Sequence, residues 1–421
     1  MTANTNSNQF YMDLYDRFGA HHYSKFPFAV DRAKGAEFWD ADGKRYIDML
    51  SCYSATSQGH CNPRIVRALN SQAKKCDAVS GAVYNTTVGK CLRKVCEITG
   101  MDAALLKNGG VEGVELSIKA MRAYGYRKKN IPKNSAEIIV AENNFHGRTI
   151  TVISFSSSEL SKESFGPYTP GFVLIKYNEL SDLEKAVNEN TAGILLEPIQ
   201  GEGGVIVPSD DYFPKIRELC DKHKVLLCLD EIQTGLGRTG KMFCYEHYGI
   251  WPDIVIIGKA LGGGVRPISG IATSREIMDT AFRPGNDGST YAEGPITGAV
   301  GLAAIEELLR IRSREGINLV QRAEVIGAYL MDELKALEHP LIKEVRGKGL
   351  LVGVEFKEPI AHQVALGLLR EGVFAKDTHE TTLRFAPPLM IPKKLVNEAV
   401  GKLEIVLSGF MNYYTGNLGW S

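Results

Sequence analysis

The sequence predicts an α/β fold, in which a mainly parallel seven-stranded sheet flanked by helices forms a large domain beside a small α+β domain. After residue 129, short apolar segments alternate with helical patterns, and such alternation is typical of parallel strands joined by crossover helices. Residues 343–356 have instead the pattern of two paired strands. The chain has 421 residues, which is too long for one ordinary core. We expect residues 51–315 to form the large domain, and residues 1–50 and 316–421 the small one.

The individual elements follow from local patterns. A hairpin is expected over residues 37–48, because Asp42-Gly43 is a turn signal between two strand-like segments. The pattern Lys107-Asn108-Gly109-Gly110 interrupts the chain and opens a helix that ends near Lys129. The expected sheet strands are 137–141, 151–155, 172–176, 193–197, 225–229, 254–257 and 269–273. The expected helices are 63–78, 86–99, 111–129, 180–187, 212–223, 296–311, 318–337, 360–371 and 393–414.

Composition excludes several classes of function. Lys+Arg and Asp+Glu both number 49, so bulk charge favours neither nucleic acid nor an anionic membrane as a partner. Apolar runs fall short of the ~20 residues that a membrane span needs. The eight cysteines form no CxxC pair and no metal-ligand cluster with histidine, which indicates a reducing compartment and no metal site. The polar N-terminus lacks arginine and an apolar core, so we expect a cytoplasmic protein.

Two predicted strands each end by presenting an ionisable side chain. The apolar run 225–229 stops at Asp230, and the run 254–257 is followed by Lys259. Ligands of open α/β sheets bind at the carboxyl ends of strands, so these two side chains can share a site. A lysine that bonds an aldehyde and a carboxylate that keeps a pyridine nitrogen protonated are what pyridoxal phosphate requires. A lone lysine or aspartate is more often a surface residue, but the paired strands and the glycines around Lys259 favour the cofactor.

A second loop has the composition of a phosphate site. Gly109, Gly110 and Val111 begin a predicted helix, where free backbone N–H groups and the helix dipole favour an anion. Glycines that serve only to turn the chain are the alternative interpretation.

The segments Leu-Asp-Glu-Ile-Gln-Thr-Gly at 229–235 and Gly-Lys-Ala at 258–260 resemble the class III, pyridoxal-phosphate-dependent aminotransferases of fold type I, and among them the ornithine aminotransferases. The resemblance extends from residue 19 to residue 388. It implies pyridoxal 5′-phosphate as the cofactor. It also implies transfer of the δ-amino group of L-ornithine to 2-oxoglutarate by a ping-pong mechanism, giving glutamate-5-semialdehyde and glutamate. The resemblance implies a homodimer with shared active sites.

The resemblance also implies a role for individual residues. Lys259 and Asp230 are the catalytic residues. The cofactor-binding residues are Gly109, Gly110, Val111, Phe145, His146, Asp230, Gln233 and Lys259, with Ser289 and Thr290 reaching the phosphate in the neighbouring subunit. The substrate-binding residues are Tyr23, Tyr53, Arg148, Glu202 and Arg384. Phe145 is expected to stack on the pyridine ring, Gln233 to bond its phenolic oxygen, and Glu202 to neutralise Arg384 while ornithine is bound. His146 is given no acid–base role.

The chain departs from the family pattern at two places near the expected phosphate. Gly109 stands where the family usually has a hydroxyl residue, and Ala292-Glu293-Gly294 replaces a neutral segment. Glu293 would repel a phosphate unless it is turned away or paired, and Arg266 is a candidate partner. Other functions also stay open: transfer from acetylornithine, 4-aminobutyrate or another ω-amine, amino-acid racemisation, or cofactor binding without turnover.

Overall fold

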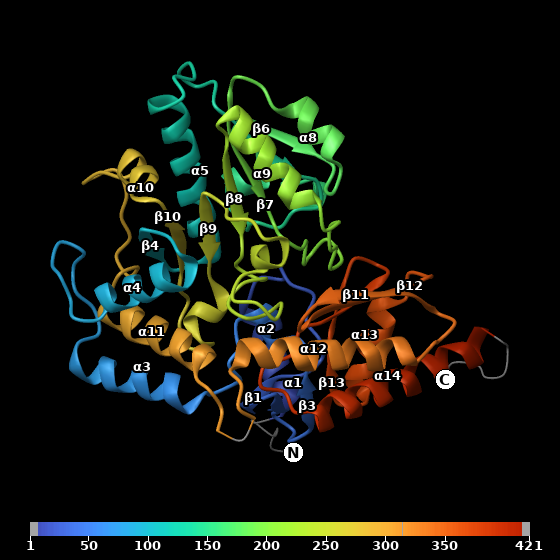
Figure 1. Ribbon diagram of the computed structural model, residues 1–421. Coiled ribbons are helices and arrows are strands. Elements are labelled where there is room, and N and C mark those ends of the chain that lie inside the picture. The colour runs from blue at the N-terminus through green and yellow to red at the C-terminus, as the bar shows by residue number, and fades with distance from the viewer. Residues whose placement is uncertain (1–6, 314, 415–421) are drawn as a thin grey trace.

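The computed structural model describes residues 7–313 and 315–414, with side chains described as far as residue 410. Its centre is a seven-stranded sheet in the order β4-β10-β9-β8-β7-β5-β6 (Figure 1). The pairs among β9, β8, β7, β5 and β6 are parallel, whereas β10 is antiparallel to both of its neighbours. The strands are β4 (Ala103–Lys107), β5 (Glu137–Ala141), β6 (Phe172–Ile175), β7 (Thr191–Leu196), β8 (Leu226–Asp230), β9 (Ile254–Ile257) and β10 (Ser269–Thr273).

Helices cover both faces of this sheet because the strands are apolar on both sides. Leu227 and Leu229 of β8 belong to the core that includes α9 (Tyr212–His223). Leu226 and Cys228 alternate with them and belong to the core that includes α5 (Gly110–Arg127). This division follows from the two-residue period of a strand. The prediction of a mainly parallel sheet between helices is confirmed.

One strand of the sheet was predicted wrongly. Residues 150–153 form a helical turn, α6 (Ile150–Ile153), and no strand forms over 151–155. Val152 and Ile153 are both buried, as adjacent residues of a helical turn can be, and a short apolar run does not distinguish this from a strand. The seventh strand is β4, which has two alanines and no β-branched residue, so its composition gave a weak signal.

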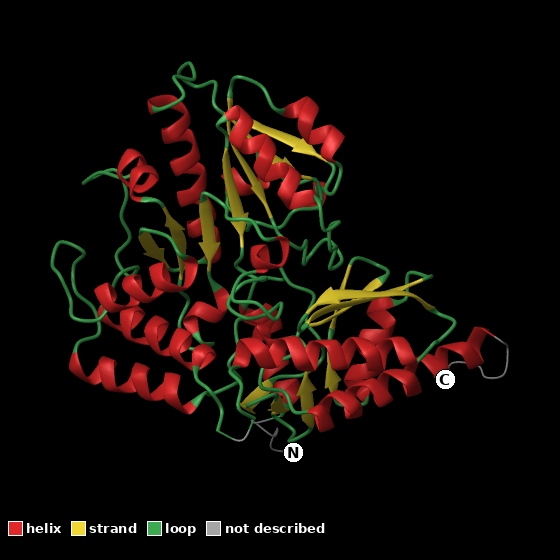
Figure 2. Ribbon diagram, in the orientation of Figure 1, coloured by secondary structure: helices red, strands yellow, loops and turns green. Residues whose placement is uncertain are grey.

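Two smaller four-stranded sheets complete the fold, in the orders β1-β2-β3-β13 and β11-β12-β15-β14 (Figure 2). The predicted N-terminal hairpin and the pairing within 343–356 are confirmed. Short strand β13 pairs with β3, so the C-terminal part of the chain is joined directly to the N-terminal part. The domain boundaries stay a prediction. The strands are β1 (Val30–Lys34), β2 (Glu37–Asp40), β3 (Arg45–Asp48), β11 (Ile342–Lys348), β12 (Leu351–Phe356), β13 (Val373–Phe374), β14 (Lys376–Thr378) and β15 (Thr382–Phe385).

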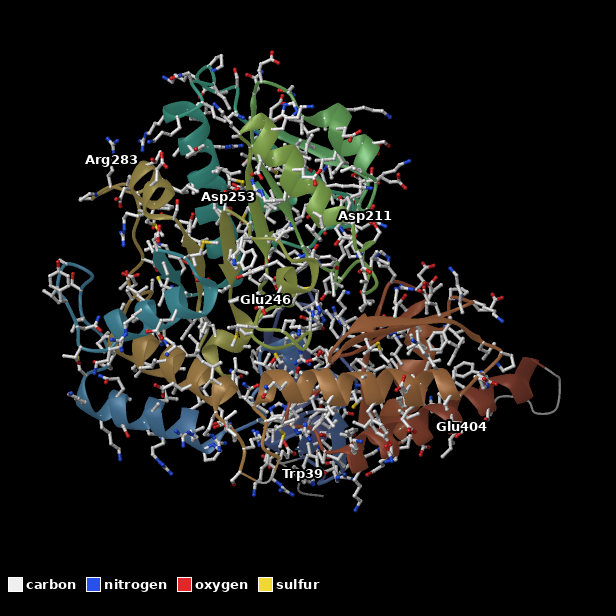
Figure 3. The ribbon with its side chains drawn as sticks, in the orientation of Figure 1. Trp39, Asp211, Glu246, Asp253, Arg283 and Glu404 are labelled. Carbon is white, nitrogen blue, oxygen red and sulfur yellow. The ribbon has the colours of Figure 1, made fainter. Side chains whose placement is uncertain are left out.

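All nine predicted helices are present. Two further helices, α1 and α10, were not predicted, and neither were the very short α2 and α7. No helix within the described ranges is both long and apolar enough to cross a membrane. Charged side chains of both signs lie at the periphery, among them Asp211, Arg283 and Glu404 (Figure 3). The remaining helices are α1 (Asn8–Phe18), α2 (Ser51–Ser54), α3 (Pro63–Lys75), α4 (Val88–Thr99), α7 (Glu159–Lys162), α8 (Leu180–Ala186), α10 (Arg275–Ala281), α11 (Pro295–Leu309), α12 (Leu319–Ala336), α13 (Ala361–Arg370) and α14 (Lys393–Tyr414).

Helix α12 approaches the connection between β11 and β12 so closely that only a glycine fits at the contact. A Cβ atom on Gly327 would overlap the backbone of Gly349. We therefore expect Gly327→Ala to lower the free energy of unfolding by about 1–3 kcal/mol through overpacking. Gly401→Ala in α14 is the matched control, because a Cβ there meets nothing within 4 Å and should raise stability by up to about 1 kcal/mol. Urea unfolding followed by circular dichroism measures both, and equal shifts would contradict the prediction.

Candidate active site

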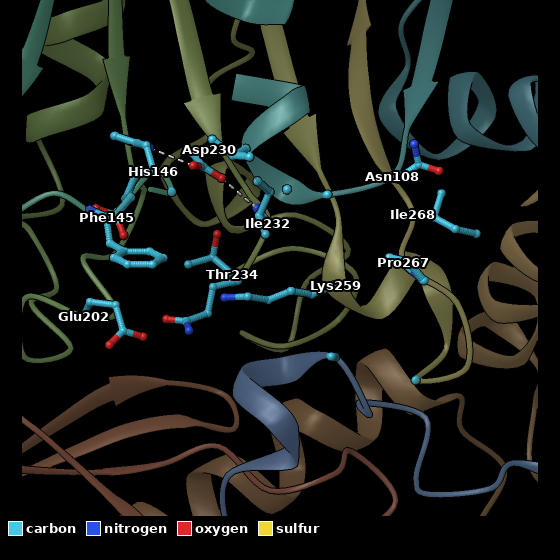
Figure 4. Close-up of a pocket in the computed structure, with 18 of the residues that line it drawn as sticks. Asn108, Phe145, His146, Glu202, Asp230, Ile232, Thr234, Lys259, Pro267 and Ile268 are labelled. Atoms are coloured by element: carbon cyan, nitrogen blue, oxygen red, sulfur yellow. Dashed lines mark hydrogen bonds and ion pairs between the residues drawn. The ribbon is translucent and has the colours of Figure 1, made fainter. Parts of the chain in front are cut away.

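A cavity of about 510 Å³ lies at the carboxyl-terminal edge of the central sheet, where we expected the ligand site. Its walls come from the ends of β7, β8 and β9, the start of α5, and the loop that follows β5 (Figure 4). The structure brings most of the predicted residues to this one cavity. The predicted residues that line it are Gly109, Gly110, Val111, Phe145, His146, Glu202, Asp230, Gln233 and Lys259.

Asp230 is buried and held from two sides. The Nδ1 atom of His146 lies 2.7 Å from Oδ2 of Asp230, and the backbone N–H of Ile232 donates to Oδ1 at 3.1 Å (Figure 4). Burial alone would lower the pKa of His146, but the hydrogen bond to Asp230 and its negative charge outweigh burial and raise that pKa. The hydrogen bond thus holds the imidazole of His146 and the carboxyl group of Asp230 together at the sheet edge. This contact gives His146 a positioning role that sequence analysis missed; the signal was a histidine that follows β5 at the same sheet edge.

Lys259 extends into the cavity directly after β9 (Figure 4). Its pKa falls from 10.5 to about 8, chiefly because burial disfavours the ammonium form, while Glu202 opposes and Arg384 adds to the decrease. None of the ion pairs among the described residues includes Lys259. About a tenth of Lys259 is thus a neutral amine at pH 7, far more than for an exposed lysine, and the neutral amine is the nucleophilic and proton-accepting form.

Glu197 is a buried acid of this cavity that the sequence analysis overlooked. It follows β7, and its Oε2 atom accepts a hydrogen bond from the backbone N–H of Phe145 at 3.0 Å. Burial raises its pKa to about 7, with the charge of Asp230 adding to the increase and that of His146 opposing it. The available signal was positional, because Glu197 ends its strand just as Asp230 ends the next one. Glu197 fixes the backbone of the residue whose ring faces the cavity.

The start of α5 forms the predicted cradle for an anion. Gly109 is the N-cap, and Glu112 accepts from the backbone N–H groups of Asn108 at 3.2 Å and Gly109 at 2.8 Å. The N–H groups of the first helical turn, from Gly110 onward, are therefore the donors left to face an anion. A Cβ on Gly147 would lie 2.5 Å from a methyl group of Val111, so this glycine lets the loop after β5 lie against the cradle.

Arg384 of β15 is fully buried and pairs with Glu202, as the resemblance implied. Its Nη1 atom lies 2.6 Å from Oε1 of Glu202. Burial opposes ionisation of Glu202, but the charge and hydrogen bond of Arg384 outweigh it and lower the pKa of that carboxyl. The guanidinium also lies 5.0 Å from the ring centroid of Tyr53, whose hydroxyl lies 3.0 Å from that of Tyr23. The two tyrosines thus adjoin the ion pair, although they line a neighbouring cavity.

Three other predicted residues lie outside the cavity. Arg148 is exposed, contacts the hydroxyl of Ser161, and lies 5.2 Å from the ring centroid of Phe145. Ser289 and Thr290 line a separate cavity of about 600 Å³. Ser289 accepts a hydrogen bond from the side chain of Asn108 at 3.0 Å, which places this loop next to the cradle.

Glu293 is bonded to the end of β4. Its carboxylate accepts from the backbone N–H of Leu106 at 3.3 Å, so it satisfies a donor near the end of β4. The proposed pairing with Arg266 is wrong. Arg266 instead donates to the hydroxyl of Thr297 at 3.1 Å and to the carbonyl of Tyr291 at 3.2 Å. These uncharged acceptors are supplied by the loop itself and by the first turn of α11.

Comparisons with known proteins give a consistent result. The family model Aminotransferase class-III matches residues 18–407. The chain is 46% identical over 392 residues to the ornithine aminotransferase of Brevibacillus brevis. The aligned region covers 93% of this chain and 96% of that protein. A structure of ornithine aminotransferase from Toxoplasma gondii, with partial occupancy of PLP, has a TM-score of 0.92 and 37% identity over 96% of this chain and 95% of that one. Acetylornithine aminotransferase from Elizabethkingia anophelis has a TM-score of 0.85 and 37% identity, over 96% and 99% of the two chains.

The lowered pKa of Lys259 predicts selective reactivity. In the protein without added ligands, acylation of Lys259 by an amine reagent should rise with pH with a midpoint of about 8, whereas exposed lysines should titrate near 10.5. Since the charge of Glu202 raises this pKa, Glu202→Gln should move the midpoint below 8. Peptide mass spectrometry after pulsed labelling measures both midpoints. The variant Lys259→Arg is the negative control, because it has no amine to label at this position. A midpoint near 10.5 in the unmodified protein would contradict the assignment.

Proposed function

The chain belongs to the class III aminotransferase family, and we propose that it transfers the δ-amino group of L-ornithine to 2-oxoglutarate. Relatives named ornithine aminotransferase, at 43–46% identity over most of the chain, support this choice. The observation that carries the proposal is the ion pair between half-buried Glu202 and fully buried Arg384 at the edge of the cavity.

The enzyme is a pyridoxal-phosphate-dependent aminotransferase, and the residues of the cavity fit this cofactor. Lys259 supplies an amine for its aldehyde, and the helix start at Gly110 supplies donors for its phosphate. Asp230, fixed by His146, supplies a carboxylate for the pyridine nitrogen, and Phe145 supplies an aromatic face. When bound, the cofactor supplies an electron sink for bond cleavage at the carbon that bears the amine.

The residues of the chain then have distinct tasks. The Nζ atom of Lys259 takes the proton from Cδ of ornithine, for which its lowered pKa suits it. His146 keeps Asp230 oriented. Phe145, held by Glu197, closes one side of the cavity. His146 and Asp230 are buried, which strengthens the electrostatic interaction between them.

The ion pair of Glu202 and Arg384 addresses the problem of two dissimilar substrates. Ornithine must present its δ-amine and keep its α-carboxylate away from the reacting carbon, so Arg384 has to be neutralised while ornithine is bound. The dicarboxylate 2-oxoglutarate needs a cation at the same place. With Glu202 turned away, Arg384 can bind a carboxylate with its planar fork. An unpaired guanidinium would be costly to bury in the free enzyme, which explains the need for the acid.

The two half-reactions test the proposal directly. L-ornithine alone should abolish the visible absorbance band of the cofactor, and 2-oxoglutarate added afterwards should restore it. N-acetyl-L-ornithine is tested as the competing amino donor, because the chain is also similar to the acetylornithine aminotransferase from Elizabethkingia anophelis. Lys259→Arg should leave the band unresponsive. A response to the acetylated donor but not to ornithine would overturn the choice of substrate. Loss of optical activity of the amino acid, with its nitrogen retained and no oxo acid needed, would favour a racemase.

We expect the variant Glu202→Gln to change which nitrogen of ornithine is transferred. Without the carboxylate, Arg384 should bind the α-carboxylate of ornithine and bring the α-amine to the reacting position. The share of α-transfer should rise about tenfold, the usual effect of one charge-assisted hydrogen bond. NMR of the glutamate formed from ornithine labelled with 15N at either position measures this share, with Glu202→Asp as the charge-preserving control. Unchanged δ-transfer by Glu202→Gln would remove the proposed masking role.

We further propose a homodimer in which Ser289 and Thr290 reach the cofactor phosphate of the partner. Their position outside the 510 Å³ cavity of their own chain supports this proposal. Lys259→Ala and the double variant Ser289→Ala/Thr290→Ala should each be inactive at limiting cofactor, and mixed dimers should regain activity at one of their two sites. Failure of mixing to restore activity, despite proven subunit exchange, would refute shared sites.

We also propose a cytoplasmic location. All eight cysteines lie within the described ranges and are unpaired, which is typical of a reducing compartment. Fractionation of the native cells tests this location. Recovery of the enzyme outside the cytoplasm would contradict it.

A further inference from the structure

The segment that carries Tyr53 has an unusual backbone. Four successive residues of α2, Ser51 to Ser54, have φ values of 47°, 48°, 57° and 78°. None of them is glycine, and L-residues rarely adopt the left-handed region in succession. Such a conformation persists only where the surrounding structure enforces it, and it is often found at functional sites.

Hydrogen bonds from three sides enforce this left-handed turn. Asp48 accepts from the backbone N–H groups of Leu50 and Ser51, both at 2.8 Å. The hydroxyl of Ser51 donates to the carbonyl of Ala386 at 2.6 Å, and that of Ser57 donates to the carbonyl of Ser54 at 2.8 Å. The turn is thereby tied to strand β3 before it and to the segment that follows Arg384.

Arg238 connects these contacts. Its Nη2 atom donates to the hydroxyls of Ser51 and Ser57, both at 2.9 Å. Its Nη1 atom donates to the carbonyls of Leu350 at 2.9 Å and Pro387 at 2.6 Å. The side chain is fully buried, and among the described residues it forms no ion pair. Only a planar fork with several donors can bridge segments from three parts of the chain in this way.

The turn delivers Tyr53 to the substrate side of the active site. The Tyr53 ring lies 5.0 Å from the guanidinium of Arg384, and the Tyr53 hydroxyl contacts that of Tyr23. Arg384 in turn pairs with Glu202. A shift of the turn would therefore move the aromatic ring against which the key arginine rests.

We propose that Arg238 is a positioning residue for substrate recognition, because it locks the left-handed turn Ser51–Ser54 and so holds Tyr53 against Arg384. Arg238 does not touch the reacting atoms and acts only through this turn. The inference rests on the proposed function for the identity of the amino donor, but the geometry of the turn is independent of it.

The experiment compares Arg238→Lys with Arg322→Lys in the holoenzyme. Arg322 is a matched control, since it is buried and donates to the carbonyl of Leu389 at 2.7 Å but has no bond to the turn. Hydrogen exchange of peptides covering residues 48–58 should be about tenfold faster in Arg238→Lys than in Arg322→Lys, as expected for loss of bonds to a charged group. If Arg238→Lys does not fold, Ser51→Ala takes its place as a milder variant. It removes one of the hydrogen bonds that Arg238 makes to the turn.

Kinetics separate a positioning role from general destabilisation. Arg238→Lys, or Ser51→Ala, should raise KM for ornithine about fivefold with little change in kcat, and this effect should vanish in a Tyr53→Ala background. Equal exchange in the two lysine variants, or a KM effect that simply adds to that of Tyr53→Ala, would overturn the inference. If the unmodified enzyme does not turn over ornithine, the proposed function fails, and the exchange comparison alone decides the role of Arg238.

Discussion

The active site depends on compensating several charges that are buried at one sheet edge. Asp230 is paired with His146, and Arg384 with Glu202. Burial of an unpaired charge is costly, so each pair is needed before any ligand arrives. Lys259 lies outside these pairs, and burial disfavours its ammonium form. The same constraint thus orders the paired charges and makes the amine of Lys259 easier to deprotonate than an exposed lysine.

Substrate choice follows from the difference between the two pairs. The pair of Asp230 and His146 is enclosed by the central sheet and is fixed by a backbone N–H as well. The pair of Glu202 and Arg384 spans two separate parts of the fold, a loop after β7 and strand β15. A rigid pair suits a constant cofactor, whereas a pair between separate segments can open for one substrate and close for the other. Arg238 contributes to the second pair by fixing the aromatic ring beside it.

The departures from the family pattern are accommodated without new charge pairs. Glu293 is directed to the backbone of β4, where burial raises the pKa of its carboxyl. Its hydrogen bond to β4 also fastens the loop that carries Ser289 and Thr290. At Gly109, the absent hydroxyl leaves the helix N–H groups as the principal donors to a phosphate. Both changes concern how the cofactor is held and leave the chemistry at Lys259 untouched.

The sequence by itself determined six of the seven strands of the central sheet, nine helices, and the placement of Asp230 and Lys259 at one cavity. These follow from apolar periodicity and from the rule that parallel strands end at one edge, which are local or topological properties. The partnership of His146 with Asp230, the buried Glu197 and the bridge made by Arg238 were decided only by tertiary structure. Each joins residues far apart in the chain, through distances and burial that no local pattern encodes. Strand β4 was missed for a related reason, because its pairing with β10 compensates for a composition that favours no strand.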